Sequence, residues 1–174
     1  MTPEFSRPVR LDEIGEVPRS IDISADAPER EALARRFALV SIEKLEAEGD
    51  VHRAGDIVHF AGRLRAEAEQ SCVATGEPVP AILDVPFALR FVPGDEMAPA
   101  DEVELSEEDC DTVTYAGGAV DLGEAAAETL ALSLDPFPRS ADADAVLKAA
   151  GVADESDVGP FAALKGLRDR LGKP

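Results

Sequence analysis

The fold is decided by residues 58–91, "VHFAGRLRAEAEQSCVATGEPVPAILDVPFALRF". Two runs of alternating apolar and polar side chains, 58–72 and 83–91, are separated by a short connection. Gly76 allows a positive backbone angle in that connection, and Pro78 stiffens its exit. Because alternation is typical of strands with one buried and one solvated face, the stretch predicts a long antiparallel hairpin. Its first strand should bury Val58, Phe60, Leu64, Ala66, Ala68 and Cys72.

Helices and further strands are predicted on both sides of this hairpin. An edge strand or extended arm is expected in 5–14, and a helix with proline in its first turn in 26–39. Residues 112–122 predict a short hairpin around two glycines, and 121–134 a helix that starts with a capping-box pair of acids. We therefore predict an α+β fold. It is a meandering antiparallel sheet, able to curl toward a barrel, with an N-terminal helix, a capped helix after the last hairpin and a short C-terminal helix.

The predicted domain organisation is one α+β domain, 1–139, followed by a C-terminal extension, 140–174. Within the domain, residues 93–111 carry nine acids and no base, which is typical of a mobile acidic loop. The extension is predicted to be a linker with one weak helix and then an amphipathic helix, 159–171, which Pro160 can begin. The apolar stripe of that helix is Phe161, Leu164, Leu167 and Leu171.

The charge of the chain argues against unaided binding to nucleic acid. Its net charge is −19, whereas binding to a phosphate backbone needs Lys and Arg to neutralise phosphates. The possible basic contacts are two pairs, Arg63 and Arg65 on the solvated face of the long strand and Lys165 and Arg168 near the C-terminus. We expect the first pair to form ion pairs with acids on the neighbouring strand, such as Glu43 or Glu46, in preference to binding phosphate.

No enzyme signature stands out in the sequence. It contains no Ser-His-Asp, P-loop or Rossmann glycine pattern, and its carboxylates are too abundant to indicate an acid–base pair. The first ten residues lack the apolar run of a signal peptide, and no window reaches the roughly 18 apolar residues that span a bilayer. We therefore expect a cytoplasmic protein without catalytic residues, cofactor or membrane contact.

Cys72, one of two cysteines, could be a nucleophile, a metal ligand or a residue of the turn. A reactive thiolate needs a nearby cation, metal or helix N-terminus, and usually a histidine as base. The neighbours Gln70, Thr75 and Glu77 supply none of these. A small apolar side chain packed at the end of the hairpin is the favoured interpretation.

A zinc site is the alternative that the residues leave open. Zinc takes about four Cys, His or carboxylate ligands, and C-x-x-C is the usual sign. Here Thr75 occupies the second cysteine position. An assembly of Cys72 with Cys110, His52 and His59 could supply four ligands, although strand parity points His59 away from Cys72.

Three stretches in order resemble the YceD family, the large ribosomal RNA subunit accumulation proteins. They are "CVATGEPV" at 72–79, "VDLGEAAAETLALSLDPFP" at 120–138 and "GPFAALKGL" at 159–167. The resemblance implies a small non-enzymatic cytoplasmic factor that supports accumulation, processing or assembly of large-subunit ribosomal RNA. Its motifs fall on Cys72, Gly76, Pro78, Asp121, Leu122, Pro138, Pro160, Phe161, Ala162 and Leu164.

The chain departs from this family where a metal would bind. Many relatives have a second cysteine three residues after the first, and some have a His and a Cys after the proline that follows the helix. This chain has Thr75, and "RSADADA" at 139–145 offers neither ligand. We therefore expect no metal, and we expect Cys72 to be structural.

The expected partner is a basic protein of the ribosome-assembly or rRNA-processing machinery, because an acidic surface is complementary to such a protein. The sequence leaves direct contact with rRNA and the oligomeric state open. Two alternatives stay open as well. One is an acidic module that mimics nucleic acid, and the other is a thiol or metal enzyme that uses Cys72.

Overall fold

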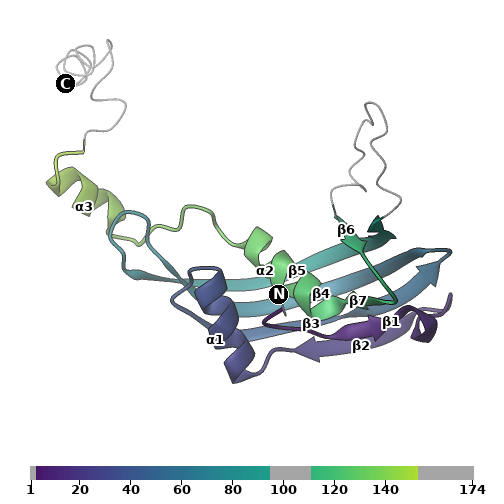
Figure 1. Cartoon of the computed structure of the whole chain (residues 1–174). Coiled ribbons are helices and arrows are strands. Elements are labelled where there is room, and N and C mark those ends of the chain that lie inside the picture. Colours follow the sequence, from purple (N-terminus) through teal and green to yellow (C-terminus); the bar gives the residue numbers. More distant parts are fainter. Residues whose placement is uncertain (1–2, 95–110, 153–174) are drawn as a thin grey trace, which may run out of the picture. The chain divides into compact units, whose positions relative to one another are not determined.

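The computed structural model describes residues 3–94 and 111–152 (Figure 1). These residues form two compact units. The larger unit contains the described residues up to Gln70 together with Pro80–Pro136, and the smaller contains Ser71–Val79 together with the described residues from Phe137 onward. No helix within the described ranges is long and apolar enough to cross a membrane.

A five-stranded sheet is the centre of the larger unit, with the strand order β2-β3-β4-β5-β6 (Figure 1). The first three strands pair antiparallel, and β6 pairs parallel to β5. Only residues 72–77 connect β4 to β5, and so short a connection requires an antiparallel pair. The strands are β2 (Arg19–Ser24), β3 (Ser41–Ala54), β4 (Ile57–Ser71), β5 (Pro78–Pro93) and β6 (Thr112–Tyr115). The predicted α+β class is confirmed, and the sheet is open and does not close into a barrel.

The predicted alternation along the first long strand is confirmed by burial. All six side chains expected on its inner face are 5% exposed or less: Val58, Phe60, Leu64, Ala66, Ala68 and Cys72. The five of these that belong to the larger unit pack into two clusters of buried side chains that also contain residues of α1 and α2. Both helices therefore cover the same face of the sheet (Figure 1).

Helix α1 (Ala27–Arg36) lies within the predicted range and begins at a capping box. The Asp26 carboxylate accepts a hydrogen bond from the Glu29 backbone N–H at 2.9 Å, and the Glu29 carboxylate accepts one from the Asp26 N–H at 2.8 Å. These two bonds satisfy donors that the first turn of a helix would otherwise leave unpaired. The helix then buries Leu33 and Ala34 against the sheet.

The predicted hairpin in 112–122 is wrong. Strand β6 joins the large sheet, whereas β7 (Ala119–Asp121) pairs antiparallel with β1 (Pro8–Arg10) in a separate two-stranded sheet. Gly117 has φ 85°, a left-handed angle that glycine adopts without strain, and it redirects the chain between the two sheets. β7 pairs with the N-terminal strand β1 and not with β6. A local sequence pattern cannot predict a pairing partner so far away in the chain. A one-turn 3-10 helix, Leu11–Glu13, follows β1.

Helix α2 (Leu122–Ser133) follows β7 directly, and its predicted capping box forms only in part. The Asp121 carboxylate accepts hydrogen bonds from the backbone N–H groups of Gly123 and Glu124 at 3.0 and 3.2 Å. The Glu124 carboxylate does not complete the box, since it binds the Arg36 guanidinium at 2.7 Å. The helix is anchored to α1 by this ion pair.

In the smaller unit, α3 (Ala143–Ala149) buries Ala143. The predicted C-terminal helix in 159–171 lies outside the described residues. So does the predicted acidic loop, apart from its first two residues and its last.

Candidate functional site

We call residues 71–79 the Cys72 turn, and it is the part of the smaller unit that joins the two long strands. The Cys72 N–H donates to the Glu77 carbonyl at 2.8 Å, and the Gly76 N–H donates to the Cys72 carbonyl at 2.9 Å. Gly76 has φ 75°, as the sequence led us to expect. These bonds close the turn around Cys72.

Residues 138–140 lie against this turn. The Val73 N–H donates to the Pro138 carbonyl at 2.9 Å, and Pro138 is buried. The Ser140 N–H donates to the Cys72 sulfur at 3.3 Å, and the hydroxyls of Ser140 and Thr75 are 3.3 Å apart. The side chain of Cys72 is therefore in contact with Thr75 and Ser140, two residues that lie 65 positions apart in the chain.

This arrangement surrounds the Cys72 sulfur with hydrogen-bond donors. The Thr75 hydroxyl and then the Ser140 backbone N–H lower the pKa of Cys72 to about 6, with smaller contributions from the Ser140 hydroxyl and the Ala74 N–H. Desolvation opposes them, because the side chain is only 3% exposed. The donors favour the thiolate, and no charged partner is needed for this effect.

The residues at this turn do not fit zinc. One thiolate and the two hydroxyls of Thr75 and Ser140 replace the set of Cys and His ligands that a structural zinc site requires. Within 3–94 and 111–152, no group of three or more His, Cys, Asp and Glu side chains could hold a metal ion.

The other residues of the predicted zinc assembly lie elsewhere. His52 and His59 are directly opposite each other on β3 and β4 in the larger unit, with their rings stacked at 4.9 Å between centroids. Burial, and then the charges of His52 and Arg90, lower the pKa of His59. Cys110 lies outside the described residues.

Asp121 has more contacts than a helix cap requires. Besides capping α2, its carboxylate accepts hydrogen bonds from the Ser6 hydroxyl at 2.5 Å and from the Arg7 N–H at 2.7 Å. Leu122, next in the chain, is fully buried, and its N–H donates to the Arg7 carbonyl at 3.1 Å. Asp121 and Leu122 thus hold the N-terminal arm, residues 5–7, against α2.

The predicted basic contacts on the sheet are paired with acids. Arg63 binds the Asp84 carboxylate at 2.8 Å, and Arg65 binds the Glu48 carboxylate at 2.6 Å. Cross-strand pairing was expected, but with Glu43 or Glu46 as the partner. The remaining predicted residues, which lie outside the described ranges, are Pro160, Phe161, Ala162, Leu164, Lys165 and Arg168.

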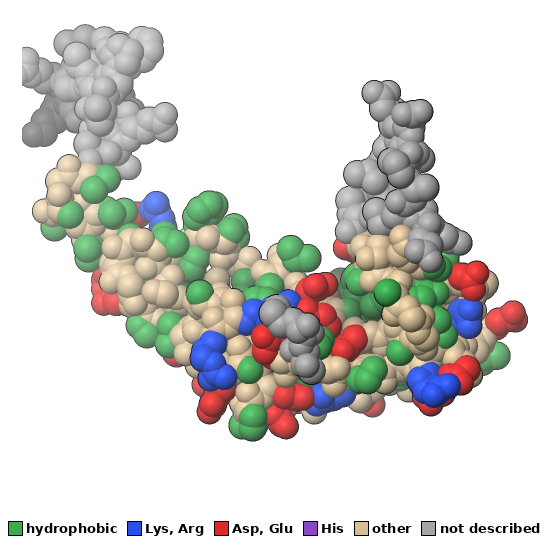
Figure 2. Space-filling model, in the orientation of Figure 1, with side chains coloured by type: hydrophobic (Ala, Val, Ile, Leu, Met, Phe, Trp, Pro, Cys, Tyr) green, Lys and Arg blue, Asp and Glu red, His purple; other side chains and the backbone are tan. Residues whose placement is uncertain are grey.

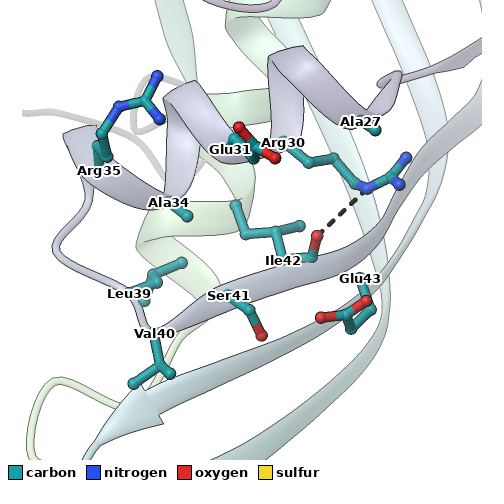
Figure 3. A pocket seen from close by; sticks show the side chains of 10 residues that line it. All are labelled: Ala27, Arg30, Glu31, Ala34, Arg35, Leu39, Val40, Ser41, Ile42 and Glu43. Carbon is teal, nitrogen blue, oxygen red and sulfur yellow. Dashed lines mark hydrogen bonds between the residues drawn. The ribbon is translucent and has the colours of Figure 1, made fainter.

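A groove between α1 and the start of β3 was missed by the sequence analysis (Figure 3). Its volume is about 480 Å³. Arg30 crosses it and donates to the Ile42 carbonyl at 3.2 Å. Two basic and two acidic side chains line it beside apolar ones, so it has no strong preference for a charged ligand. The lining residues are Ala27, Arg30, Glu31, Ala34, Arg35, Leu39, Val40, Ser41, Ile42 and Glu43.

Comparison with protein families gives a match to the model described as "Large ribosomal RNA subunit accumulation protein YceD", over residues 60–168. The chain belongs to the YceD family. The part of the match that the structure describes contains the Cys72 turn and helices α2 and α3. The groove beside α1 lies entirely before the YceD match. No curated protein and no solved structure matched the chain.

Two contacts of this YceD chain could not have been found from its sequence. Ser140 is one of several small polar residues after Pro138, and nothing in "RSADADA" distinguishes it. The contacts of Ser6 and Arg7 with Asp121 join residues more than 100 positions apart. Both depend on which distant segments meet in the fold.

Proposed function

We propose that this protein is a non-enzymatic factor that supports accumulation of large-subunit ribosomal RNA during its processing or assembly. The observation that carries the proposal is the YceD family match over residues 60–168. The family's description names accumulation of this RNA, and the Cys72 turn and the capped helix α2 lie in the matched region.

A basic protein partner fits this function better than direct binding to RNA. The net charge of −19 repels phosphate and attracts Lys- and Arg-rich proteins. Arg63 and Arg65 are already bound to carboxylates. On the face seen in Figure 2, acidic and basic side chains lie interspersed over the described residues, and no extended basic area is visible. In this mechanism the protein recruits or protects the RNA through the partner, in the cytoplasm.

The test is the ratio of large- to small-subunit ribosomal RNA in cells depleted of the protein. We expect a selective fall in the large-subunit RNA, restored by the full chain. A second rescue with residues 159–174 deleted tests the predicted C-terminal helix, whose stripe of Phe161 and Leu164 could contact the partner. We expect that deletion to abolish rescue while the melting temperature of the purified protein stays nearly unchanged.

An unchanged RNA ratio would contradict the proposal and favour the second candidate, an acidic module that mimics nucleic acid and occupies a basic site on another protein. The same charge of −19 supports that candidate. The identity of proteins captured with the full chain separates the two, since only the first candidate requires a ribosomal or rRNA-processing partner. Loss of rescue in Cys72→Ser with the fold intact would instead point to thiol chemistry.

A further inference from the structure

Among the residues that the structure describes, no strand lies beside most of one edge of β5. Its residues 90–93 pair with β6, whereas no strand of the described residues pairs with that side of residues 80–89. We call residues 80–89 the β5 edge. A free edge of this length exposes a row of backbone groups that can pair with another chain.

Two hydrogen bonds show which residues of β5 direct their backbone groups toward this edge. The Arg90 N–H donates to the Asp111 carbonyl at 3.0 Å, on the side of β6. The Glu77 carbonyl accepts from Cys72, on the side of β4. Exposed and less exposed side chains alternate without interruption from 78 to 89, so this part of the strand contains no bulge. Odd- and even-numbered residues therefore keep the same two sides along it. Even-numbered residues of the β5 edge therefore face outward.

Prolines occupy two of these outward positions. Pro80 and Pro86 have no backbone N–H, so the outward donors that remain belong to Ile82, Asp84 and Ala88. The outward carbonyls remain as acceptors, although that of Asp84 already accepts a hydrogen bond from the Arg63 guanidinium at 3.4 Å. The edge is therefore rich in acceptors and poor in donors, which disfavours pairing with a second copy of the same edge.

We propose that the β5 edge binds an extended arginine- or lysine-rich segment of a protein partner. Guanidinium and ammonium groups donate hydrogen bonds and accept none, so they match an edge that offers mainly carbonyls. The net charge of −19 favours the same partner. The side chain of Ile82 on this edge is 80% exposed, so the partner can approach it. The inference rests on the proposed function and names the surface through which it would act.

The experiment measures binding of a peptide of alternating arginine and threonine, about ten residues long, to the full chain. We expect binding that weakens with added salt, and none to a matched peptide of aspartate and threonine. In nuclear magnetic resonance spectra the carbonyl carbons of Ile82 and Ala88 should shift on binding.

Two matched variants locate the site. Ile82→Lys and Ala61→Lys each add one positive charge at an exposed position on the same face of the sheet, the first on the β5 edge and the second on β4. We expect Ile82→Lys to weaken peptide binding about tenfold and Ala61→Lys to change it less than about twofold. Equal losses in both variants, or carbonyl shifts confined to other strands, would overturn the proposal.

Two further outcomes separate this inference from the proposed function. If the wild-type chain does not bind the arginine peptide although its depletion lowers large-subunit RNA, the edge is not the contact and the proposed function stands. If deleting residues 159–174 strengthens peptide binding at the same carbonyls, the chain's own basic end occupies the edge, and the assignment to a partner is wrong.

Discussion

At the scale of single residues, hydrogen-bond donors to the sulfur of Cys72 stabilise this turn. The sulfur is almost completely buried, yet it accepts the Ser140 N–H at 3.3 Å and lies beside the Thr75 hydroxyl. Donors to sulfur stabilise the charged form, which is why the pKa of Cys72 is lowered to about 6. With a pKa of about 6, the Cys72 thiol is mostly ionised at neutral pH.

The lowered pKa predicts a pH dependence of stability. The ordinary pKa of a cysteine thiol is 9.0, and the donors lower the pKa of Cys72 in the folded protein to about 6. The thiolate therefore contributes its full stability above the unfolded value and loses it as the pH falls through the folded value. We expect the urea midpoint of the wild type to rise relative to Cys72→Ser between pH 6 and 9.

Both proteins should carry Cys110→Ser, so that Cys72 is the only thiol of the first and the Cys72→Ser protein has none. Both proteins contain the same two histidines, so the contribution of these residues to the pH dependence cancels in the comparison. The ultraviolet absorption of the thiolate gives the pKa directly, and Thr75→Val should raise it, because this change removes the first donor. A wild-type thiol that titrates near 9 would contradict the assignment.

At the scale of elements, the N-terminal arm and α2 are fitted closely together. A Cβ atom on Gly123 would lie 2.7 Å from the Phe5 carbonyl oxygen and 2.9 Å from the Arg7 nitrogen. Phe5 is fully buried, and the backbone of Arg7 is bonded to both Asp121 and Leu122. The arm cannot move away without loss of these bonds.

Gly123→Ala should therefore destabilise the protein by about 1–3 kcal/mol, because the added methyl group collides with the backbone of the arm. Gly118→Ala is the control: a Cβ there has no atom within 4 Å, and we expect a change within about 0.5 kcal/mol. Chemical denaturation of the two variants measures both values. Equal stability of the variants would show that the arm does not pack on α2 as described.

At the scale of the whole molecule, the prolines of β5 bear on association between copies. Pro80 and Pro86 remove donors from an edge that no strand of the described residues covers, and β2 at the opposite edge of the sheet is only six residues long. Short strands and prolines on edges are the means by which sheet proteins avoid pairing edge to edge. Mutual repulsion between chains of net charge −19 acts in the same direction.

The double substitution Pro80→Thr and Pro86→Thr should restore two outward donors and promote self-association. We expect the variant to form dimers or larger species at high salt, where repulsion is screened, under conditions in which the wild type does not change its mass. Light scattering after size exclusion measures this. Exposed Pro8→Thr on β1 is the control and should behave as the wild type does. Unchanged mass of the double variant would show that other features protect the edge.

Much of the element content followed from the sequence alone. The long hairpin, helix α1 and helix α2 were all predicted, because periodicity and capping residues act within a few positions of the chain. The inward position of Cys72 followed from the same parity. Composition also determined the net charge of −19.

The tertiary structure alone decided how these pieces meet. It placed β6 beside β5 and β7 beside β1, it directed Glu124 to Arg36, and it brought Ser140 to the sulfur of Cys72. Each of these contacts joins segments far apart in the chain, and its free energy depends on competition among all the surfaces that could pair. A local pattern has no information about that competition, whereas it does determine which face of a strand is apolar.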